Sequence, residues 1–277
     1  MRVRQLLFCL VWVCVASTTE AEPRYKVSYG ELSQLAARTP DAVLAYGEDP
    51  LQRIFTWQAS GETKASVVFI HGGCWLNAYN IDHSRGFLTD LAARGYTVYG
   101  VEYRRTGDEG GGWPGTFTDV REALQMLEKR LNDSHPVYVL GHSAGGHLAL
   151  LAAPALAFAD KIIGLAAITD IAEYAKGDNS CQAATPAFMQ RPREQAPEAW
   201  HNANPRSYTM PASVLLMQGG ADAIVPARQS VWRGVAQQLI EGSGHFDWLH
   251  PKSAAFAALL SVLNQSHKET HDSHESQ

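Results

Sequence analysis

The sequence VYVLGHSAG at residues 137–145 joins a short apolar run to a serine between two glycines. The apolar run predicts a buried strand, and the Ala- and Leu-rich residues 144–159 predict a mostly buried helix directly after it. A G-x-S-x-G pattern in this context is typical of a turn so tight that side chains at Gly141 and Gly145 would collide with neighbouring backbone. We therefore expect Ser143 at the tip of the turn, in a strained conformation, with the positive end of the helix beside its hydroxyl. A serine that only caps a buried helix is the alternative interpretation.

Similar apolar runs recur along the chain and alternate with helical patterns. Strands are predicted at residues 67–70, 98–103, 137–140, 162–168 and 213–217, with a weaker one at 235–240. Helices are predicted at residues 83–94, 119–131, 144–159 and 253–264, with Asp119 as the N-cap of the second. Continuous apolar strands are typical of a parallel sheet covered on both faces, so the alternation predicts a three-layer α/β fold.

The composition fits one globular domain or two small ones. The chain has 277 residues, of which 45% are hydrophobic and 18% are charged. A chain of this length buries about 70–75% of the surface that its unfolded form exposes. The composition and the length together exclude wholly disordered, collagen-like and disulfide-dense classes. The formal net charge of -5 leaves no basic surplus to neutralise phosphates, so we expect no nucleic-acid partner.

The first residues have the layout of a secretory signal peptide. Arg2 and Arg4 precede an apolar run at residues 6–16, and cleavage is expected after Ala21 or Ala16. A membrane anchor is the weaker alternative, because the run is shorter than the about 20 residues that a spanning helix needs. No later segment is apolar enough to span a bilayer. These features predict a signal peptide over residues 1–21 and a secreted or periplasmic protein.

Two later regions do not fit the strand–helix alternation. Residues 171–210 contain four prolines and a stretch rich in Gln, Arg and Glu, and we interpret them as a cap inserted over one end of the sheet. The main folded domain then spans residues 22–264. Residues 265–277 contain no apolar residue and are predicted to be a disordered tail, whose three histidines could at most bind a metal weakly.

A second glycine motif, HGGCW at residues 71–75, follows the predicted strand at 67–70. A Gly-Gly loop there leaves backbone N–H groups unpaired, and the amides of Gly72 and Gly73 can form an oxyanion hole with that of Ala144. We expect His71 to fix the loop by hydrogen bonding rather than to act as a base. A plain glycine turn is the alternative.

Two cysteines, Cys74 and Cys181, remain once the signal peptide is removed. A disulfide between them and two unpaired thiols are both compatible with the sequence, because spacing alone does not give the geometry.

The pair HGGCW and GHSAG resembles the esterase side of the α/β-hydrolase superfamily. The likeness is greatest to members with an H-G-G-x-W loop, which include carboxylesterases and kynurenine-formamidase-like enzymes. Residues 102–104 (EYR) and 111–115 (GGWPG) are similar to segments of that group as well, and the resemblance covers about residues 45–262. It implies an α/β-hydrolase fold and a triad in the chain order serine, acid, histidine.

The expected partners of Ser143 follow two later predicted strands. Asp222 comes after the strand at 213–217, and His245 comes after the weaker strand at 235–240. The carboxyl ends of parallel strands face one crevice, so the three residues can meet there. Asp170, after the strand at 162–168, is the alternative acid.

Other candidates for the base or the acid fit less well. His142 and His147 ride on the turn and helix of the serine itself, and His250 lies at the start of the last helical region. Asp247 is too close to His245 in sequence to orient its ring easily.

These residues predict a serine hydrolase that cleaves a small carboxylic ester without a metal or organic cofactor. His245 takes the Ser143 proton, Asp222 holds the imidazole, and an acyl-enzyme forms and is hydrolysed. We expect the cap to roof the pocket, with Trp75, Trp113 and Phe246 at its edge.

Two other functions use the same sequence features. An aryl-formamidase or peptidase would use the same triad. An inactive ligand-binding hydrolase fold would be marked by the loss of a triad residue, and none is lost.

Overall fold

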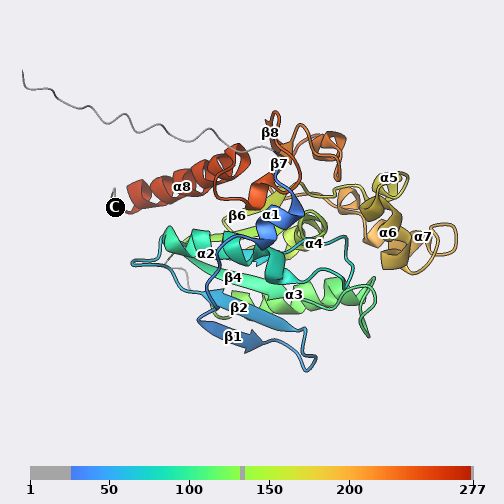
Figure 1. Cartoon of the computed structure of the whole chain (residues 1–277), viewed down its shortest axis with the longest axis horizontal. Helices are drawn as coiled ribbons and strands as arrows, with labels where there is room; N and C mark the ends of the chain where they lie inside the picture. Colours follow the sequence, from blue (N-terminus) through green and yellow to red (C-terminus); the bar gives the residue numbers. More distant parts are fainter. Residues whose placement is uncertain (1–25, 132–134, 276–277) are drawn as a thin grey trace, which may run out of the picture.

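The structure is a computed structural model that describes residues 26–131 and 135–275, with side chains up to residue 265. The predicted signal peptide, residues 1–21, lies outside these ranges. An eight-stranded sheet runs through the described part, in the order β1-β2-β4-β3-β5-β6-β7-β8 (Figure 1). The strands are β1 (Ala42–Ala45), β2 (Arg53–Trp57), β3 (Ala65–Ile70), β4 (Tyr96–Glu102), β5 (Val137–His142), β6 (Lys161–Leu165), β7 (Val214–Gly219) and β8 (Ala236–Ile240).

All strand pairs from β4 to β8 are parallel, and only the first two strands run antiparallel to their neighbours. The predicted parallel strands are therefore confirmed, including the weak one that became β8. β1 and β2 were not predicted. β1 is a short edge strand of four residues, three of them exposed, so it lacks the long apolar run that marked the others.

The α-helices are α1 (Tyr29–Ser33), α2 (Arg85–Ala93), α3 (Gly115–Glu128), α4 (Ala144–Ala152), α5 (Ile171–Tyr174), α6 (Ser180–Met189), α7 (Pro197–Asn202) and α8 (Ala254–Glu275). Short 3-10 turns lie at Ile81–Ser84 (η1), Ala153–Ala155 (η2), Pro205–Ser207 (η3), Ala227–Ser230 (η4) and Asp247–Leu249 (η5).

Several predicted helix boundaries were wrong, among them the end of the helix predicted at 144–159, because α4 ends at Ala152. Asp119 does not cap α3, which begins at Gly115. The buried Asp119 carboxylate instead forms an ion pair with Arg104 and accepts a hydrogen bond from Gln52, so tertiary partners use the group that looked like a cap. The last helix, α8, continues to Glu275 through most of the predicted disordered tail, where no Gly or Pro interrupts it.

The sheet divides the core into two layers, as the alternation of side chains along β3 shows. Val67 and Phe69 belong to the cluster that also contains side chains of α2 and α8. Val68 and Ile70 belong to the cluster that also contains side chains of α3 and α4. Successive side chains of a strand point to opposite faces, so one apolar run serves both layers. Each such side chain contributes roughly 1.5–3 kcal/mol through its burial.

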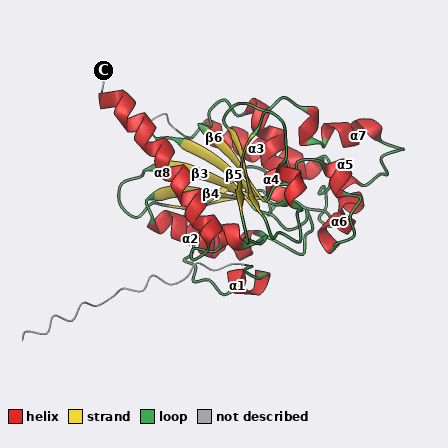
Figure 2. Ribbon diagram, turned by 90° about the horizontal axis from the view of Figure 1, so that it is seen from above, coloured by secondary structure: helices red, strands yellow, loops and turns green. Residues whose placement is uncertain are grey.

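This topology brings distant residues to one edge of the sheet. Because β5, β7 and β8 are parallel, the loops that follow their carboxyl ends lie at the same edge. Residues 171–210 form α5, α6, α7 and η3 between β6 and β7, beyond this end of the sheet (Figure 2). The fold therefore places the motif serine, the two candidate acid and base loops and the insertion in one region.

Candidate active site

The turn after β5 has the strained geometry that the sequence predicted. Ser143 has φ 56° and ψ -119°, and α4 begins with the next residue. A Cβ atom at Gly141 would overlap the Gly145 carbonyl, and one at Gly145 would overlap the carbonyls of Ile70 and His71. Only glycine fits at either position, so the turn is tight for a steric reason. The Ser143 N–H donates to the Leu165 carbonyl at 2.9 Å, which ties the turn to the end of β6.

The loop after β3 packs directly on this turn. A Cβ atom at Gly72 would lie 2.9 Å from the His142 carbonyl oxygen and 3.0 Å from Ser143 Cβ. Gly73 has φ +114°, and a Cβ atom there would meet Tyr79 Cβ at 2.5 Å. Gly72 therefore allows the loop backbone to approach the serine closely, and Gly73 allows the close contact with Tyr79.

The three predicted oxyanion-hole amides lie on this loop and at the start of α4. Among the described residues, no acceptor is found for the N–H groups of Gly72, Gly73 and Ala144. Unpaired amides beside a serine are the arrangement that stabilises a developing oxyanion.

The structure pairs His245 with Asp222. His245 Nδ1 lies 2.8 Å from Asp222 Oδ2, and both side chains are nearly inaccessible to solvent. Asp222 Oδ1 accepts the N–H groups of Ile224 and Val225 at 2.8 and 2.9 Å, so the carboxylate is held from the side away from the ring. A carboxylate on Nδ1 holds that proton and leaves Nε2 as the acceptor nitrogen. Among the described residues no hydrogen bond joins Ser143 to His245, a link that is often long without substrate.

The two competing carboxylates have other partners. Asp170 accepts the Glu173 N–H at 3.1 Å as the N-cap of α5, and it also accepts from Asn204. Asp247 accepts the N–H groups of Val27 at 2.7 Å and Gly244 at 3.0 Å. Asp247 therefore anchors the backbone of the histidine loop instead of orienting the imidazole.

His142 has a role that the sequence analysis missed. Its ring lies 4.7 Å from that of His245, and its Nε2 is 2.9 Å from the His245 carbonyl oxygen. Burial and the neighbouring His245 lower the pKa of His142 well below its usual value, so the ring is neutral and donates this bond. The residue next to the serine thus holds the histidine loop. Its position inside the motif was the only clue in the sequence.

His71 fixes its loop as predicted. Its Nε2 contacts Glu102 Oε1 at 3.0 Å, its Nδ1 contacts the Gly72 carbonyl at 2.7 Å, and its ring stacks on Tyr103. Glu102 also pairs with Arg105 at 3.0 Å. With both ring nitrogens in use, His71 is a structural anchor for the Gly72–Gly73 backbone.

The family model BD-FAE matches residues 53–233, which is more than half of the chain. The chain belongs to the BD-FAE family.

Two curated relatives extend this likeness. Esterase LipC of Mycobacterium tuberculosis is 24% identical over 264 residues, which cover 80% of this chain and 64% of LipC. Kynurenine formamidase of Debaryomyces hansenii is 32% identical over 118 residues, which cover 40% of this chain and 38% of the formamidase. The chain thus spans less than two thirds of the length of either relative.

Solved structures show the same architecture. Esterase B from Lactobacillus rhamnosis superposes with a TM-score of 0.69 at 18% identity, covering 87% of this chain and 91% of that chain. A truncated carbohydrate esterase from gut microbiota superposes with a TM-score of 0.65 at 18% identity, covering 84% and 99%. This BD-FAE family member has the α/β-hydrolase fold.

The three predicted pocket residues lie in three different environments. Trp75 is fully buried, stacks on Phe188 with ring centres 4.7 Å apart, and donates from its indole N–H to His147. Trp75 was predicted at the pocket edge, and the structure places it in the core under the loop, with a positive φ of 57°. Phe246 lies edge-on to the His245 ring, with centres 5.0 Å apart, and is half-buried beside the site.

Trp113 lies in a separate cavity. It lines about 460 Å³ of space against the end of α6 and α7, with Arg191, Glu198 and Asn202 on the other walls. Its ring stacks on Phe117.

Tyr29 is an aromatic neighbour of the site that the sequence analysis missed. It comes from α1, is partly exposed, and contacts Phe246 and Tyr79 with ring centres 5.9 and 5.6 Å apart. No local pattern marks it, because the contact joins residues more than 200 positions apart.

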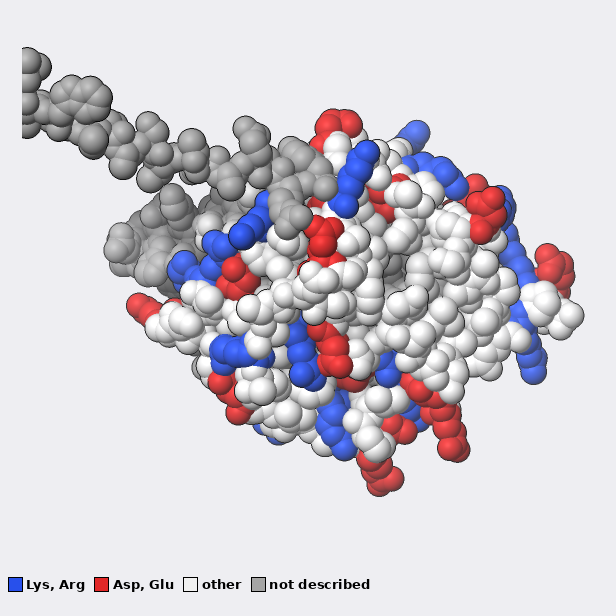
Figure 3. Space-filling view, viewed as in Figure 1, with Lys and Arg blue, Asp and Glu red and all other residues white. Residues whose placement is uncertain are grey.

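The described residues contain no group of three or more His, Cys, Asp or Glu side chains arranged to hold a metal ion. In the same part of the chain, no helix has the length and hydropathy needed to cross a membrane. On the face shown in Figure 3, uncharged residues cover most of the surface toward α5–α7, and Lys, Arg, Asp and Glu stand mainly around its rim.

Proposed function

We propose that this protein is a serine hydrolase that cleaves carboxylic esters of small molecules through an acyl-enzyme. The observation that carries the proposal is the His245–Asp222 hydrogen bond of 2.8 Å at the sheet edge that also holds the Ser143 turn. The relatives named esterase LipC and esterase B support the ester bond as the target.

The reaction follows from the chemistry of these groups. Ser143 Oγ attacks the ester carbonyl carbon while His245 Nε2 takes the hydroxyl proton, and Asp222 stabilises the resulting imidazolium. The negative carbonyl oxygen is held by the amides of Gly72, Gly73 and Ala144, each worth about 3–4 kcal/mol in the transition state. The imidazolium then gives its proton to the leaving alcohol. Water hydrolyses the acyl-enzyme by the same steps in reverse.

The nucleophile is tested with a fluorophosphonate probe and p-nitrophenyl esters of C2 to C16 acids. We expect the wild-type protein to be labelled and to release p-nitrophenol. Ser143→Ala should lose both reactions and keep the wild-type thermal unfolding midpoint. Labelling of the Ser143→Ala protein would refute the assignment, and a wild-type protein inert toward every ester would refute the ester class.

A formamidase reaction is the second candidate, and the 32% identity to kynurenine formamidase over 118 residues favours it. The same triad would attack the formyl carbon of an aryl formamide. Wild-type kcat/KM for N-formylkynurenine and for p-nitrophenyl acetate decides between the two, because a formamidase would prefer the amide by at least about tenfold.

We also propose that the substrate lies against Phe246, whose ring centre is 5.0 Å from that of His245, and against Tyr29, which contacts Phe246.

We further propose that the protein is exported. The Cys74–Cys181 disulfide supports export, since disulfides persist mainly in oxidising compartments. Mass spectrometry of the protein purified from its native host tests export, because signal removal predicts a new N-terminus after Ala21 or Ala16. A chain that retains residue 1 and is recovered only from the cytoplasm would refute it.

A further inference from the structure

The loop at residues 71–75 carries two of the proposed oxyanion amides and is called the oxyanion loop below. Its backbone conformation is unfavourable for the residues that carry a Cβ atom. Gly73, Cys74 and Trp75 have φ values of 114°, 55° and 57°, so three consecutive residues occupy the left-handed region. For a residue with a Cβ atom this region costs about 1–2 kcal/mol. Cys74 and Trp75 therefore need contacts elsewhere in the molecule to hold them, and these contacts also hold the Gly72 and Gly73 amides.

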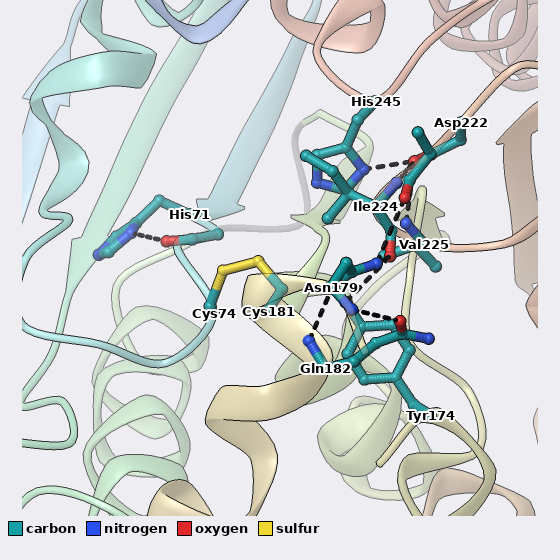
Figure 4. Close-up of a disulfide and its surroundings, with 12 residues drawn as sticks. His71, Cys74, Tyr174, Asn179, Cys181, Gln182, Asp222, Ile224, Val225 and His245 are labelled. Atoms are coloured by element: carbon teal, nitrogen blue, oxygen red, sulfur yellow. Dashed lines mark hydrogen bonds and ion pairs between the residues drawn. A yellow bond between two sulfur atoms is a disulfide. The ribbon is translucent and has the colours of Figure 1, made fainter. Parts of the chain in front are cut away.

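The insertion provides those contacts. Cys74 is joined to Cys181 on α6 by a disulfide that is almost fully buried (Figure 4). Trp75 stacks on Phe188 of the same helix. Its indole N–H also donates to His147 Nδ1 at 3.2 Å, and His147 Nε2 donates to the Ala203 carbonyl at 2.7 Å. The disulfide is the only covalent contact among these.

The turn that starts α6 also holds the loop of the candidate acid. Asn179 is the N-cap of α6, and its side-chain amide donates to the Ile224 carbonyl at 2.9 Å (Figure 4). The Tyr174 hydroxyl donates to the same carbonyl at 3.1 Å. Because the Ile224 N–H is bound to Asp222, this turn supports the acid from outside the triad. Asn179, which binds the loop of Asp222, is therefore only two positions from Cys181, which is bonded to the oxyanion loop.

We propose that the Cys74–Cys181 disulfide is a positioning element of the reaction, which holds the oxyanion amides at the place where the negative charge develops. The proposal rests on the ester hydrolysis proposed above. Neither sulfur touches the substrate, so the disulfide acts through Gly72 and Gly73. It also makes turnover dependent on the oxidation state of the two cysteines.

Reduction by a dithiol has a balanced course. One thiolate of the reductant attacks one sulfur of the disulfide and breaks the S–S bond, which gives a mixed disulfide and one cysteine thiolate. The second thiolate of the reductant then closes a cyclic disulfide and releases the other cysteine. Two electrons pass to the protein, two protons complete the thiols of Cys74 and Cys181, and the dithiol is oxidised.

The test compares Cys181→Ala with Ala184→Gly, a control on the same helix that keeps the disulfide. Ala184 is buried as well, and Gly in a helix interior destabilises by about 1 kcal/mol. We expect Cys181→Ala to lower kcat for p-nitrophenyl acetate about 10- to 100-fold, because removal of one oxyanion donor costs about 10²–10³. KM should stay within threefold, and fluorophosphonate labelling should slow as much as kcat. The control should stay within twofold of wild type in all three.

Amide hydrogen exchange gives a readout that does not need activity. In Cys181→Ala, exchange of the Leu76 N–H, which donates to the Gly73 carbonyl at 2.9 Å, should accelerate at least tenfold, while β3 and β5 keep wild-type protection. A kcat within twofold of wild type, unchanged exchange of the Leu76 N–H, or an equal loss in Ala184→Gly overturns the proposal. A wild-type protein without esterase activity refutes the proposed function, and the exchange experiment still decides whether the disulfide holds the loop.

Wild-type protein treated with dithiothreitol replaces Cys181→Ala if that variant does not fold. Reduction is followed by thiol titration, and native tryptophan fluorescence reports the fold. The proposal predicts that kcat falls in step with the thiols that appear and returns on reoxidation. Full activity with two titrated thiols overturns it.

Discussion

Two histidine–carboxylate pairs lie at the carboxyl edge of the sheet, and their second ring nitrogens differ. His71 contacts Glu102 through Nε2 and the Gly72 carbonyl through Nδ1, so no nitrogen remains for chemistry. His245 contacts Asp222 through Nδ1, and among the described residues no partner is found for its Nε2. An imidazole acts as a base only through a nitrogen that can accept a proton. Under the proposed function, His245 is therefore the base, and His71 anchors the loop.

The largest expected effect comes from replacing each histidine by glutamine, which tests whether His245 and His71 have different roles. His245→Gln should lower kcat/KM for a p-nitrophenyl ester by roughly 10⁴- to 10⁶-fold, the range for loss of a triad histidine. His71→Gln keeps a hydrogen-bonding amide and should retain at least about a tenth of the activity. Steady-state kinetics of both purified variants, with thermal unfolding as the check on folding, provide the measurement. Equal losses in the two variants would contradict the division of roles.

The two carboxylates near β6 and β7 offer the next comparison. Asp222→Asn keeps the shape of the side chain but cannot hold the Nδ1 proton, and kcat should fall by roughly 10⁴-fold. Asp170→Asn is the matched control, because Asp170 caps α5 and does not contact His245. Asparagine also caps helices well, so this variant should keep kcat within about threefold. A larger loss in Asp170→Asn than in Asp222→Asn would move the acid to the end of β6.

The predictable part of the site is the part that local sterics or chain order dictate. Gly141 and Gly145 could be interpreted because a Cβ atom at either would overlap backbone of the turn itself or of the loop after β3. Asp222 and His245 could be proposed because parallel strands bring their following loops to one edge. The parallel strands could be predicted as well, since burial on both faces requires continuous apolar runs.

The remainder depends on long-range contacts that leave no local pattern. The burial of Trp75 depends on its stacking with Phe188 of the insertion, which is more than 100 positions away in the sequence. Asp119 was predicted to be a helix N-cap, but its carboxylate forms an ion pair with Arg104. The Cys74–Cys181 disulfide joins residues 107 positions apart, and the sequence left it open.

Glu102→Gln tests how much the pair of His71 and Glu102 contributes to stability. Burial alone would raise the pKa of Glu102, but His71, Arg105 and the Ile81 N–H outweigh it and lower the pKa, so the side chain is charged. Glutamine leaves the buried Arg105 with less compensating charge, and loss of one partner of a buried pair costs about 3–5 kcal/mol. Urea unfolding at pH 7 should show this loss, while the kcat of the folded protein stays within tenfold. An unfolding free energy within 1 kcal/mol of wild type would mean that this pair anchors little.

The smallest effect comes from the neutral histidine beside the structural pair. The His83 ring lies 5.9 Å from that of His71, and burial is the main cause that lowers the pKa of His83 to about 4. In the unfolded chain its pKa is about 6.5, so between pH 6.5 and 4 the unfolded state binds the extra proton. The unfolding free energy should therefore fall as the pH drops through this window, by on the order of 3 kcal/mol for this histidine.

His83→Gln isolates that contribution, because glutamine carries no proton to titrate. Urea unfolding of wild type and variant at intervals from pH 7 to pH 4 should give a shallower slope for the variant. The buried His142 and His147 remain in both proteins, and their lowered pKa values add the same slope to each. Parallel curves would show that His83 takes up its proton in the folded state as easily as in the unfolded chain. In that case the buried surroundings of His71 and Glu102 would accept a protonated histidine. Burial would then not be the property that separates this pair from His245 and Asp222.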